Sequence, residues 1–257
     1  MNSLTSVLLS VSELSLHAAG TVLLDKVSVQ INAGELLAVI GPNGAGKSSL
    51  LKLLAGVSTP TTGLIKLGAM SLADCSVTHK ARSVAYLEQR PHVYWPLTVR
   101  QVVSLGRLPH AGTSLENSAL AVQRALVFTG IAALQERLFN TLSEGEKMLV
   151  NISRVLATEP RIILADEPTA ALDPYHQLLV LELLRTLAGK GQGIMVVLHD
   201  LNLAARFCDR LLLLAGGRVL CDGTPEAVLS SGHIAQAYHI DAVYDSITKT
   251  VQTKGRL

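Results

Sequence analysis

The chain has 257 residues, of which 49% are hydrophobic and 16% charged, and its formal net charge is +2. This length suits one large or two small domains with a sizeable core, and the apolar composition excludes a disordered chain. The small net charge and the absence of a Lys/Arg block argue against nucleic acid as a partner, whereas the low charged fraction suggests that a partner covers some apolar surface.

The N-terminal segment predicts antiparallel strands. Between residues 7 and 31 apolar and polar residues alternate in short stretches, as at Val27 and Val29, so one face of this sheet is expected to be solvated. Residues 19–20 and 32–34 carry the Gly and Asn that mark turns.

We expect a protein of a reducing compartment that does not itself enter a membrane. Residues 1–11 lack the basic start and the cleavage site of a signal peptide, and no apolar run approaches the length of a membrane span. Cys75, Cys208 and Cys221 are scattered without metal-type spacing, which is typical of reduced thiols that serve as small core residues. A membrane would therefore be met only through another protein.

A glycine-rich loop follows the apolar run at residues 36–40, which is typical of a buried parallel strand. The loop has two glycines with four residues between them, then Lys and a hydroxyl residue, and leucines at helical spacing continue to about Ala55, with Gly56 as a C-cap. In a strand–loop–helix context, backbone N–H groups converge on a phosphate at the helix N-terminus. The residues predicted to bind the phosphates are Gly41, Pro42, Asn43, Gly44, Ala45, Gly46, Lys47, Ser48 and Ser49.

Two side chains of this loop have defined tasks in the motif. Lys47 would reach the β- and γ-phosphates, and the Ser48 hydroxyl would ligate Mg²⁺. The alternative, a plain glycine-rich turn, is disfavoured by the flanking strand and helix.

From about residue 90 to residue 157 the pattern changes to helices. Pro91, Pro96 and Pro109 punctuate a stretch with a short helix near residues 99–106 and a longer one at 118–128. This predicts an inserted helical subdomain rather than more sheet.

A further helix is expected to begin at residues 142–146. Ser143 and Glu146 have capping-box spacing, and an amphipathic pattern follows. The segment is either only a helix start or a second helix N-terminus that binds an anion.

Sheet signals then return. Residues 162–165 and 194–198 are continuous apolar strands separated by a helical pattern at 175–187, and residues 211–214 and 219–221 predict a hairpin. Strands that alternate with helices predict an α/β core with a mainly parallel sheet.

Polar residues follow several of these strands. Asp166 suits the carboxylate that holds Mg²⁺ opposite the loop hydroxyl, and Glu167 is placed to act as general base toward water. Without the loop, the pair would be interpreted as a helix start. His199 and Gln89 also follow strands, where α/β proteins bind ligands, although each alone would be interpreted as structural.

Together these residues resemble the ATP-binding subunit of an ATP-binding-cassette (ABC) transporter. The resemblance implies a P-loop NTPase (ABC ATPase) α/β core with an N-terminal antiparallel β subdomain and an inserted helical subdomain at about 90–157, in one ATP-binding domain over residues 1–257. The matching elements, in chain order, are the loop at 41–49, Gln89, residues 142–146, Asp166-Glu167, Ala171-Leu172-Asp173 and His199.

The resemblance implies that two copies meet head to tail, with each ATP between the loop of one copy and residues 142–146 of the other, the signature segment. Asp173 would cross the interface, and His199 would hold the γ-phosphate and the attacking water. Mg²⁺ would be bound by Ser48 and Asp166 and sensed by Gln89, which would also couple to the membrane subunits. The signature residues that would act in trans are Ser143, Glu144, Gly145 and Glu146.

The resemblance also implies partners and a location: integral-membrane permease subunits and, indirectly, a substrate-binding protein, at the cytoplasmic face of the inner membrane. Within the family, residues 95–99 and 105–110 look like the importers of iron-siderophore, heme and cobalamin.

Two departures from the family pattern affect function. The signature normally reads Leu-Ser-Gly-Gly-Gln, but its third and fifth positions here are Glu144 and Glu146. We expect Glu144 to turn outward and Glu146 to cap its own helix, and we hypothesise slower hydrolysis than is usual. The position of the adenine-stacking aromatic is Ala18, beside His17, so GTP is expected to compete, which a nucleotide-competition assay tests.

Two other functions stay open. A soluble ABC ATPase of DNA repair or translation would usually carry a long coiled-coil insertion or a second cassette, and neither is visible. A regulatory nucleotide-binding subunit with weak hydrolysis is compatible with the unusual signature.

Overall fold

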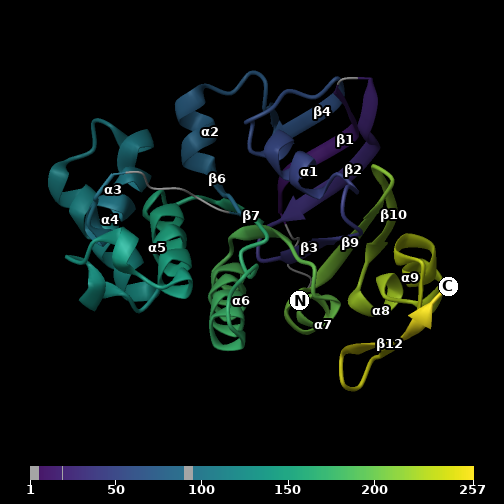
Figure 1. Cartoon of the computed structure of the whole chain (residues 1–257). Coiled ribbons are helices and arrows are strands. Elements are labelled where there is room, and N and C mark those ends of the chain that lie inside the picture. Colours follow the sequence, from purple (N-terminus) through teal and green to yellow (C-terminus); the bar gives the residue numbers. More distant parts are fainter. Residues whose placement is uncertain (1–5, 19, 90–94) are drawn as a thin grey trace, which may run out of the picture.

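The computed structural model describes residues 6–18, 20–89 and 95–257 (Figure 1). The predicted turn at 19–20 and the predicted start of the helical stretch, with Pro91, lie partly or wholly outside the described residues.

The N-terminal sheet is antiparallel where β1 pairs with β2 and β4, and β4 with β5, as predicted. Its strand order is β2-β1-β4-β5. The prediction of short strands was wrong, because the first two strands form one long hairpin with several register shifts. The strands are β1 (Val7–Ala18), β2 (Thr21–Asn32), β4 (Thr62–Leu67) and β5 (Met70–Ser71).

The central sheet has the order β10-β9-β3-β8-β7-β6, and each neighbouring pair is parallel except β9 and β10. The predicted mainly parallel sheet is therefore confirmed. β3, β7 and β8 are buried at every residue, which explains their unbroken apolar sequences. The strands are β3 (Leu36–Ile40), β6 (Val84–Leu87), β7 (Ile162–Asp166), β8 (Gly193–Val197), β9 (Arg210–Ala215) and β10 (Arg218–Gly223).

The two faces of this sheet have separate cores. Along β3, Leu37 and Val39 belong to a cluster with the N-terminal sheet and helix α1 (Lys47–Leu54), whereas Leu36, Ala38 and Ile40 belong to a cluster with α6 (Pro174–Gly189). Because α1 lies between two sheets, its leucines are buried on all sides. The loop before α1 therefore lies between two buried elements, strand β3 before it and helix α1 after it.

The helical stretch encloses a third apolar cluster of its own. The longer predicted helix begins at Leu115 rather than at residue 118, because the Ser114 hydroxyl accepts a hydrogen bond from the Asn117 N–H and caps it there. A short helix, α2 (Val77–Ser83), was not predicted. The elements of the stretch are α3 (Val99–Ser104), η1 (Leu105–His110), α4 (Leu115–Phe128), η2 (Ala132–Leu134), η3 (Phe139–Thr141) and α5 (Glu144–Ala157).

Element η1 docks on the C-terminal end of α5. Arg107 donates to the Ala157 carbonyl at 2.7 Å, and His110 Nε2 lies 2.9 Å from the Thr158 carbonyl oxygen. A Cβ on Gly106 would lie 2.1 Å from the Arg154 carbonyl oxygen, so only glycine fits. The motif at 105–110 thus has a structural task at the helix that begins in the signature segment.

The C-terminal part was not predicted. It comprises α7 (Leu201–Phe207), α8 (Pro225–Val228), α9 (Ser231–Tyr238) and the hairpin β11 (Ile240–Asp245) and β12 (Thr250–Arg256), drawn in green to yellow in Figure 1. The N–H of Val251 donates to Asn202 Oδ1 at 2.6 Å, which fixes the hairpin on α7.

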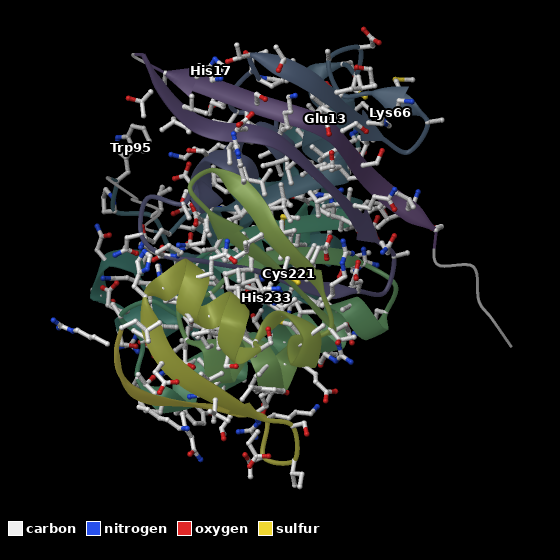
Figure 2. The ribbon with its side chains drawn as sticks, turned by 90° about the vertical axis from the view of Figure 1, so that its right-hand side faces the viewer. Glu13, His17, Lys66, Trp95, Cys221 and His233 are labelled. Atoms are coloured by element: carbon white, nitrogen blue, oxygen red, sulfur yellow. The ribbon has the colours of Figure 1, made fainter. Side chains whose placement is uncertain are left out.

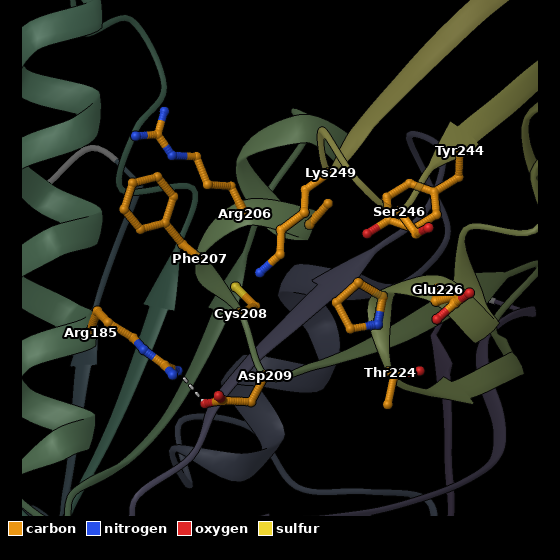
Figure 3. A pocket seen from close by; sticks show the side chains of 12 residues that line it. Arg185, Arg206, Phe207, Cys208, Asp209, Thr224, Glu226, Tyr244, Ser246 and Lys249 are labelled. Carbon is orange, nitrogen blue, oxygen red and sulfur yellow. Dashed lines mark hydrogen bonds and ion pairs between the residues drawn. The ribbon is translucent and has the colours of Figure 1, made fainter.

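A cleft of about 440 Å³ is lined by the end of α7, the start of α8 and the C-terminal hairpin (Figure 3). At its edge Arg185 and Asp209 form an ion pair at 2.5 Å, and Lys249 points into it. Cys208 is buried beside it, and burial raises the pKa of its thiol to about 12, so the thiol stays protonated. Cys75 and Cys208 are buried as expected, whereas Cys221 is half-buried; all three are free thiols.

Among the helices of the described residues, none combines the length and the apolar character needed to cross a membrane.

Candidate active site

The candidate site lies where the carboxyl ends of neighbouring parallel strands meet. The loop at 41–46 follows β3, Asp166 ends β7, His199 comes two residues after β8, and Gln89 comes two residues after β6. Because these strands are parallel neighbours, their carboxyl ends share one edge of the sheet.

Two glycines of the loop, Gly41 and Gly46, are required by close backbone approach. Gly46 has φ 96°, and a Cβ there would lie 2.6 Å from the Leu23 carbonyl oxygen. Gly41 has φ 147°, and a Cβ there would lie 2.1 Å from the Leu214 carbonyl oxygen. The loop is therefore pressed between the N-terminal sheet and β9, which holds its N–H groups at the start of α1.

Lys47 lies inside this loop. Its ammonium donates to the carbonyl oxygens of Gly41 at 2.7 Å and Pro42 at 2.9 Å. Burial lowers the pKa of Lys47, and the nearby carboxylates of Glu167 and Asp166 oppose the shift. The Lys47 ammonium is thus held by carbonyl oxygens of the loop itself, near both acidic residues.

Ser48 and Asp166 converge as their predicted roles as magnesium ligands require. The Ser48 hydroxyl donates to Asp166 Oδ1 at 3.0 Å. Burial raises the pKa of Asp166, and its hydrogen bonds with Ser48 and Tyr86 oppose the shift. In the described part of the chain, His, Cys, Asp and Glu form no group of three that would hold a metal ion by itself. A hydroxyl and one carboxylate suit Mg²⁺, which usually keeps several waters and phosphate oxygens as ligands.

Tyr86 is a site residue that the sequence did not predict. Its hydroxyl donates to Asp166 Oδ2 at 3.2 Å, so both carboxylate oxygens of Asp166 are hydrogen-bonded. Burial, then the neighbouring Asp166, raises the pKa of the phenol, so it stays a donor. The only signal in the sequence was a hydroxyl in an otherwise apolar strand.

Glu167 is held from both sides. His199 Nε2 lies 2.5 Å from Glu167 Oε1, and Gln89 Nε2 donates to Glu167 Oε2. Glu167 also has φ 50°, a left-handed conformation that costs a non-glycine residue about 1–3 kcal/mol and is often found at functional sites. Gln89 thus contacts the Glu167 carboxylate, and its expected proximity to Mg²⁺ stays a prediction.

The signature segment begins α5 with the expected capping box. The Ser143 hydroxyl accepts from the Glu146 N–H at 3.2 Å, and the Glu146 carboxylate accepts from the Ser143 N–H at 2.8 Å, a bond that lowers the pKa of Glu146. The Glu144 carboxylate is exposed and pairs with Lys147 at 2.7 Å, so it turns outward as expected. α5 packs with α3 and α4, away from α1 (Figure 1), so one chain does not bring this segment to its own loop.

Asp173 also lies apart from the loop. It caps α6, and its carboxylate accepts the His176 N–H at 3.0 Å, which lowers the pKa of Asp173.

On the expected adenine side, the first hairpin carries the imidazole of His17 but no phenyl, phenol or indole ring. His17 and Ala18 are both exposed near the end of β1 (Figure 2), and the sequence of residues 7–32 contains no Phe, Trp or Tyr.

Known proteins resemble the chain over most of its length. The sequence profile of the ABC transporter family matches residues 24–170. The hemin import ATP-binding protein HmuV of Gloeobacter violaceus is 41% identical over 244 residues, which are 92% of this chain and 89% of that protein. The cobalamin import ATP-binding protein BtuD of Halobacterium salinarum is 41% identical over 234 residues, which are 90% of this chain and 58% of that protein. A solved ATP-binding subunit of an ABC transporter is 31% identical, with a TM-score of 0.76 over 86% of this chain and 91% of its own.

Proposed function

Because the chain belongs to the ABC transporter family, we propose that it binds ATP at residues 41–49 and hydrolyses it with Glu167 as general base, to energise import through a separate membrane permease. The carrying observation is the convergence of Lys47, Ser48, Asp166 and Glu167 at one edge of the sheet.

The proposed chemistry has two parts, neutralisation of phosphate charge and transfer of a proton from water. Lys47 neutralises the β- and γ-phosphates, and Glu167 accepts a proton from the attacking water. His199 and Gln89 fix the Glu167 carboxylate, which favours one orientation of the base. His199 then contacts the γ-phosphate and the water.

Mg²⁺ is the proposed cofactor, with Ser48 and Asp166 as its protein ligands. When bound, it neutralises charge that develops on the phosphate oxygens. The Ser48–Asp166 pair supports this assignment, since the hydroxyl and the carboxylate already lie 3.0 Å apart. The role of Gln89 as magnesium sensor stays a prediction.

We propose that two copies associate head to tail. The signature segment then covers the loop of the other copy, with Ser143 and Gly145 at the γ-phosphate and Glu144 and Glu146 beside it, and Asp173 crosses the interface. Support comes from the distance in the fold between this segment and the loop of the same chain (Figure 1). The division into a single domain over 1–257 with a helical subdomain at about 90–157 is part of the same proposal.

The proposed substrate is one of three compounds: a ferric siderophore, which is an iron chelate, or heme, or cobalamin. This rests on relatives whose names specify hemin and cobalamin import. The chain would lie at the cytoplasmic face of the membrane, bound to its permease, and a substrate-binding protein would deliver the cargo from outside. Co-purification of the permease, followed by uptake assays with heme, cobalamin and a ferric siderophore, tests this choice.

Turnover of the parent chain and of Glu167→Gln tests the enzymatic function. We expect the substitution to lower ATP hydrolysis at least about hundredfold, since general-base catalysis contributes 10²–10⁴-fold, while ATP binding is retained. Retained hydrolysis in Glu167→Gln would contradict the role of Glu167.

A regulatory subunit with weak hydrolysis is the second candidate, and the carboxylate of Glu144 in the signature favours it. In that case the parent and Glu167→Gln would be equally inactive.

A further inference from the structure

We infer that His176 is a positioning residue that ties the Asp173 turn to Gly145 of the signature segment, so that both reach a second copy as one unit. This inference rests on the proposed head-to-tail association.

The first link joins His176 to Asp173. His176 Nδ1 lies 2.7 Å from Asp173 Oδ2, while the His176 N–H donates to Asp173 Oδ1 at 3.0 Å. Because an ionised carboxylate only accepts, Nδ1 carries the proton. Both carboxylate oxygens of Asp173, the expected interface residue, are therefore held by His176. The side chain of Asp173 is 58% exposed, so these two contacts leave it accessible to a partner.

The second link joins the His176 ring to Gly145. A Cβ on Gly145 would lie 2.4 Å from the Cγ and Cδ2 atoms of the ring, so the ring packs directly on the glycine backbone. Gly145 has no left-handed backbone, and the close approach alone requires glycine there. The neighbouring positions of the signature carry glutamate, whereas Gly145 keeps the residue that this contact needs.

The first turn of α6 also holds the segment that connects β7 to α6. Gln177 Nε2 donates to the Leu172 carbonyl at 3.1 Å and to the Thr169 carbonyl at 3.4 Å. Further along α6, Val180, Leu181 and Leu184 are buried in the central core, so the helix start is a rigid support.

The contact has a consequence for association. Ordering a free segment costs backbone entropy, and a binding surface that is already ordered avoids this cost. His176 orders Asp173 and the signature segment against each other before a partner arrives.

Two substitutions each break one of the two links, and the joined unit needs both. His176→Asn keeps an N–H donor near the position of Nδ1 and removes the ring, whereas His176→Phe keeps a ring against Gly145 and removes the donor. Each should raise hydrogen exchange of amides at residues 143–147 and 174–177 at least about fivefold in the single copy. Circular dichroism and the melting temperature establish that each variant is folded.

ATP-driven association provides the second measurement, in a Glu167→Gln background that retains ATP. Each His176 substitution should weaken association about tenfold, while the affinity of the single copy for ATP changes less than twofold.

His233→Asn is the matched control. His233 is also the third residue of a helix, and its Nδ1 lies 2.9 Å from the Oγ of Ser230, the residue at the N-cap position. It lies on α9, at the C-terminal side of the molecule (Figure 2). This variant should match the parent in both measurements.

The outcomes are distinct. If folded His176→Asn and His176→Phe exchange and associate like the parent, the inference is wrong. If the Glu167→Gln parent never associates with ATP, the proposed head-to-tail function fails, and the exchange measurement still decides whether His176 joins the two segments.

Discussion

Asp166 and Glu167 are adjacent in sequence but are held by different neighbours. Asp166 is buried and hydrogen-bonded by Ser48 and Tyr86, whereas Glu167 is held by His199 and Gln89. Successive residues of a strand point to opposite sides, and the left-handed backbone of Glu167 turns its side chain away from the strand direction. These different surroundings are compatible with the proposed division of roles, in which Asp166 binds Mg²⁺ and Glu167 accepts a proton from water.

Tyr86→Phe should weaken the magnesium response. The substitution removes the hydrogen bond to Asp166 Oδ2, and the loss of such an outer partner typically lowers metal affinity 10–100-fold. We expect the Mg²⁺ concentration for half-maximal ATP hydrolysis to rise about tenfold, with ATP binding without metal unchanged. A magnesium titration measures it, with Tyr244→Phe on β11 as control. An unchanged midpoint would show that Tyr86 does not orient Asp166.

Glu144→Gly should raise the rate of ATP hydrolysis. In the proposed dimer Glu144 lies near the γ-phosphate, although its carboxylate turns outward to Lys147. Two unit charges 4 Å apart interact by about 1 kcal/mol in water, so removing this carboxylate is worth up to about fivefold in rate. Lys147→Ala provides the converse test, because it frees Glu144 from its 2.7 Å ion pair and should lower the rate. If the rate of ATP hydrolysis is unchanged in both variants, the hypothesis that the Glu144 carboxylate slows hydrolysis is wrong.

At the scale of elements, the sequence predicted what periodicity and spacing encode. The buried strands β3, β7 and β8, the loop at 41–49 and the capping box at Ser143 and Glu146 are local patterns, and each was found. Tyr86 and His176 were missed, because their contacts join elements far apart in the chain, Tyr86 with Asp166 and His176 with Gly145. The start of α4 was missed for a different reason, since one capping serine outweighed the helical period.

Gly106→Ala should destabilise the packing of η1 on α5. The added methyl group would lie 2.1 Å from the Arg154 carbonyl oxygen, and overpacking of this kind costs about 1–3 kcal/mol. Urea unfolding should show a lower midpoint. Gly189→Ala is the matched control: it meets open space at the end of α6 and should be neutral or stabilising by up to about 0.5–1 kcal/mol. Equal midpoints for Gly106→Ala and the parent would contradict the close contact.

At the scale of the molecule, the proposed site residues form two groups in different parts of the chain. The loop, Asp166 and Glu167 lie at one edge of the sheet, and the signature segment and Asp173 lie elsewhere in the fold. No periodic pattern predicted the C-terminal elements, because α8 and α9 have only 4 and 8 residues, too short for a clear helical period. The proposal that a second copy covers the loop at residues 41–49 cannot be tested on a single chain. It needs an experiment with two copies.

Complementation between two inactive variants tests whether the site is shared. Lys47→Ala disables the loop and Ser143→Arg blocks the signature, so each homodimer should be inactive. A head-to-tail heterodimer combines the intact loop of one with the intact signature of the other. With random pairing, half of the dimers would carry one working site of two, so a 1:1 mixture should regain about a quarter of the parent ATPase activity. Mixing Lys47→Ala with the double variant Lys47→Ala/Ser143→Arg supplies no intact loop and must stay inactive. If the first mixture also stays inactive while both variants still associate, each site is built within one chain and the head-to-tail arrangement is wrong.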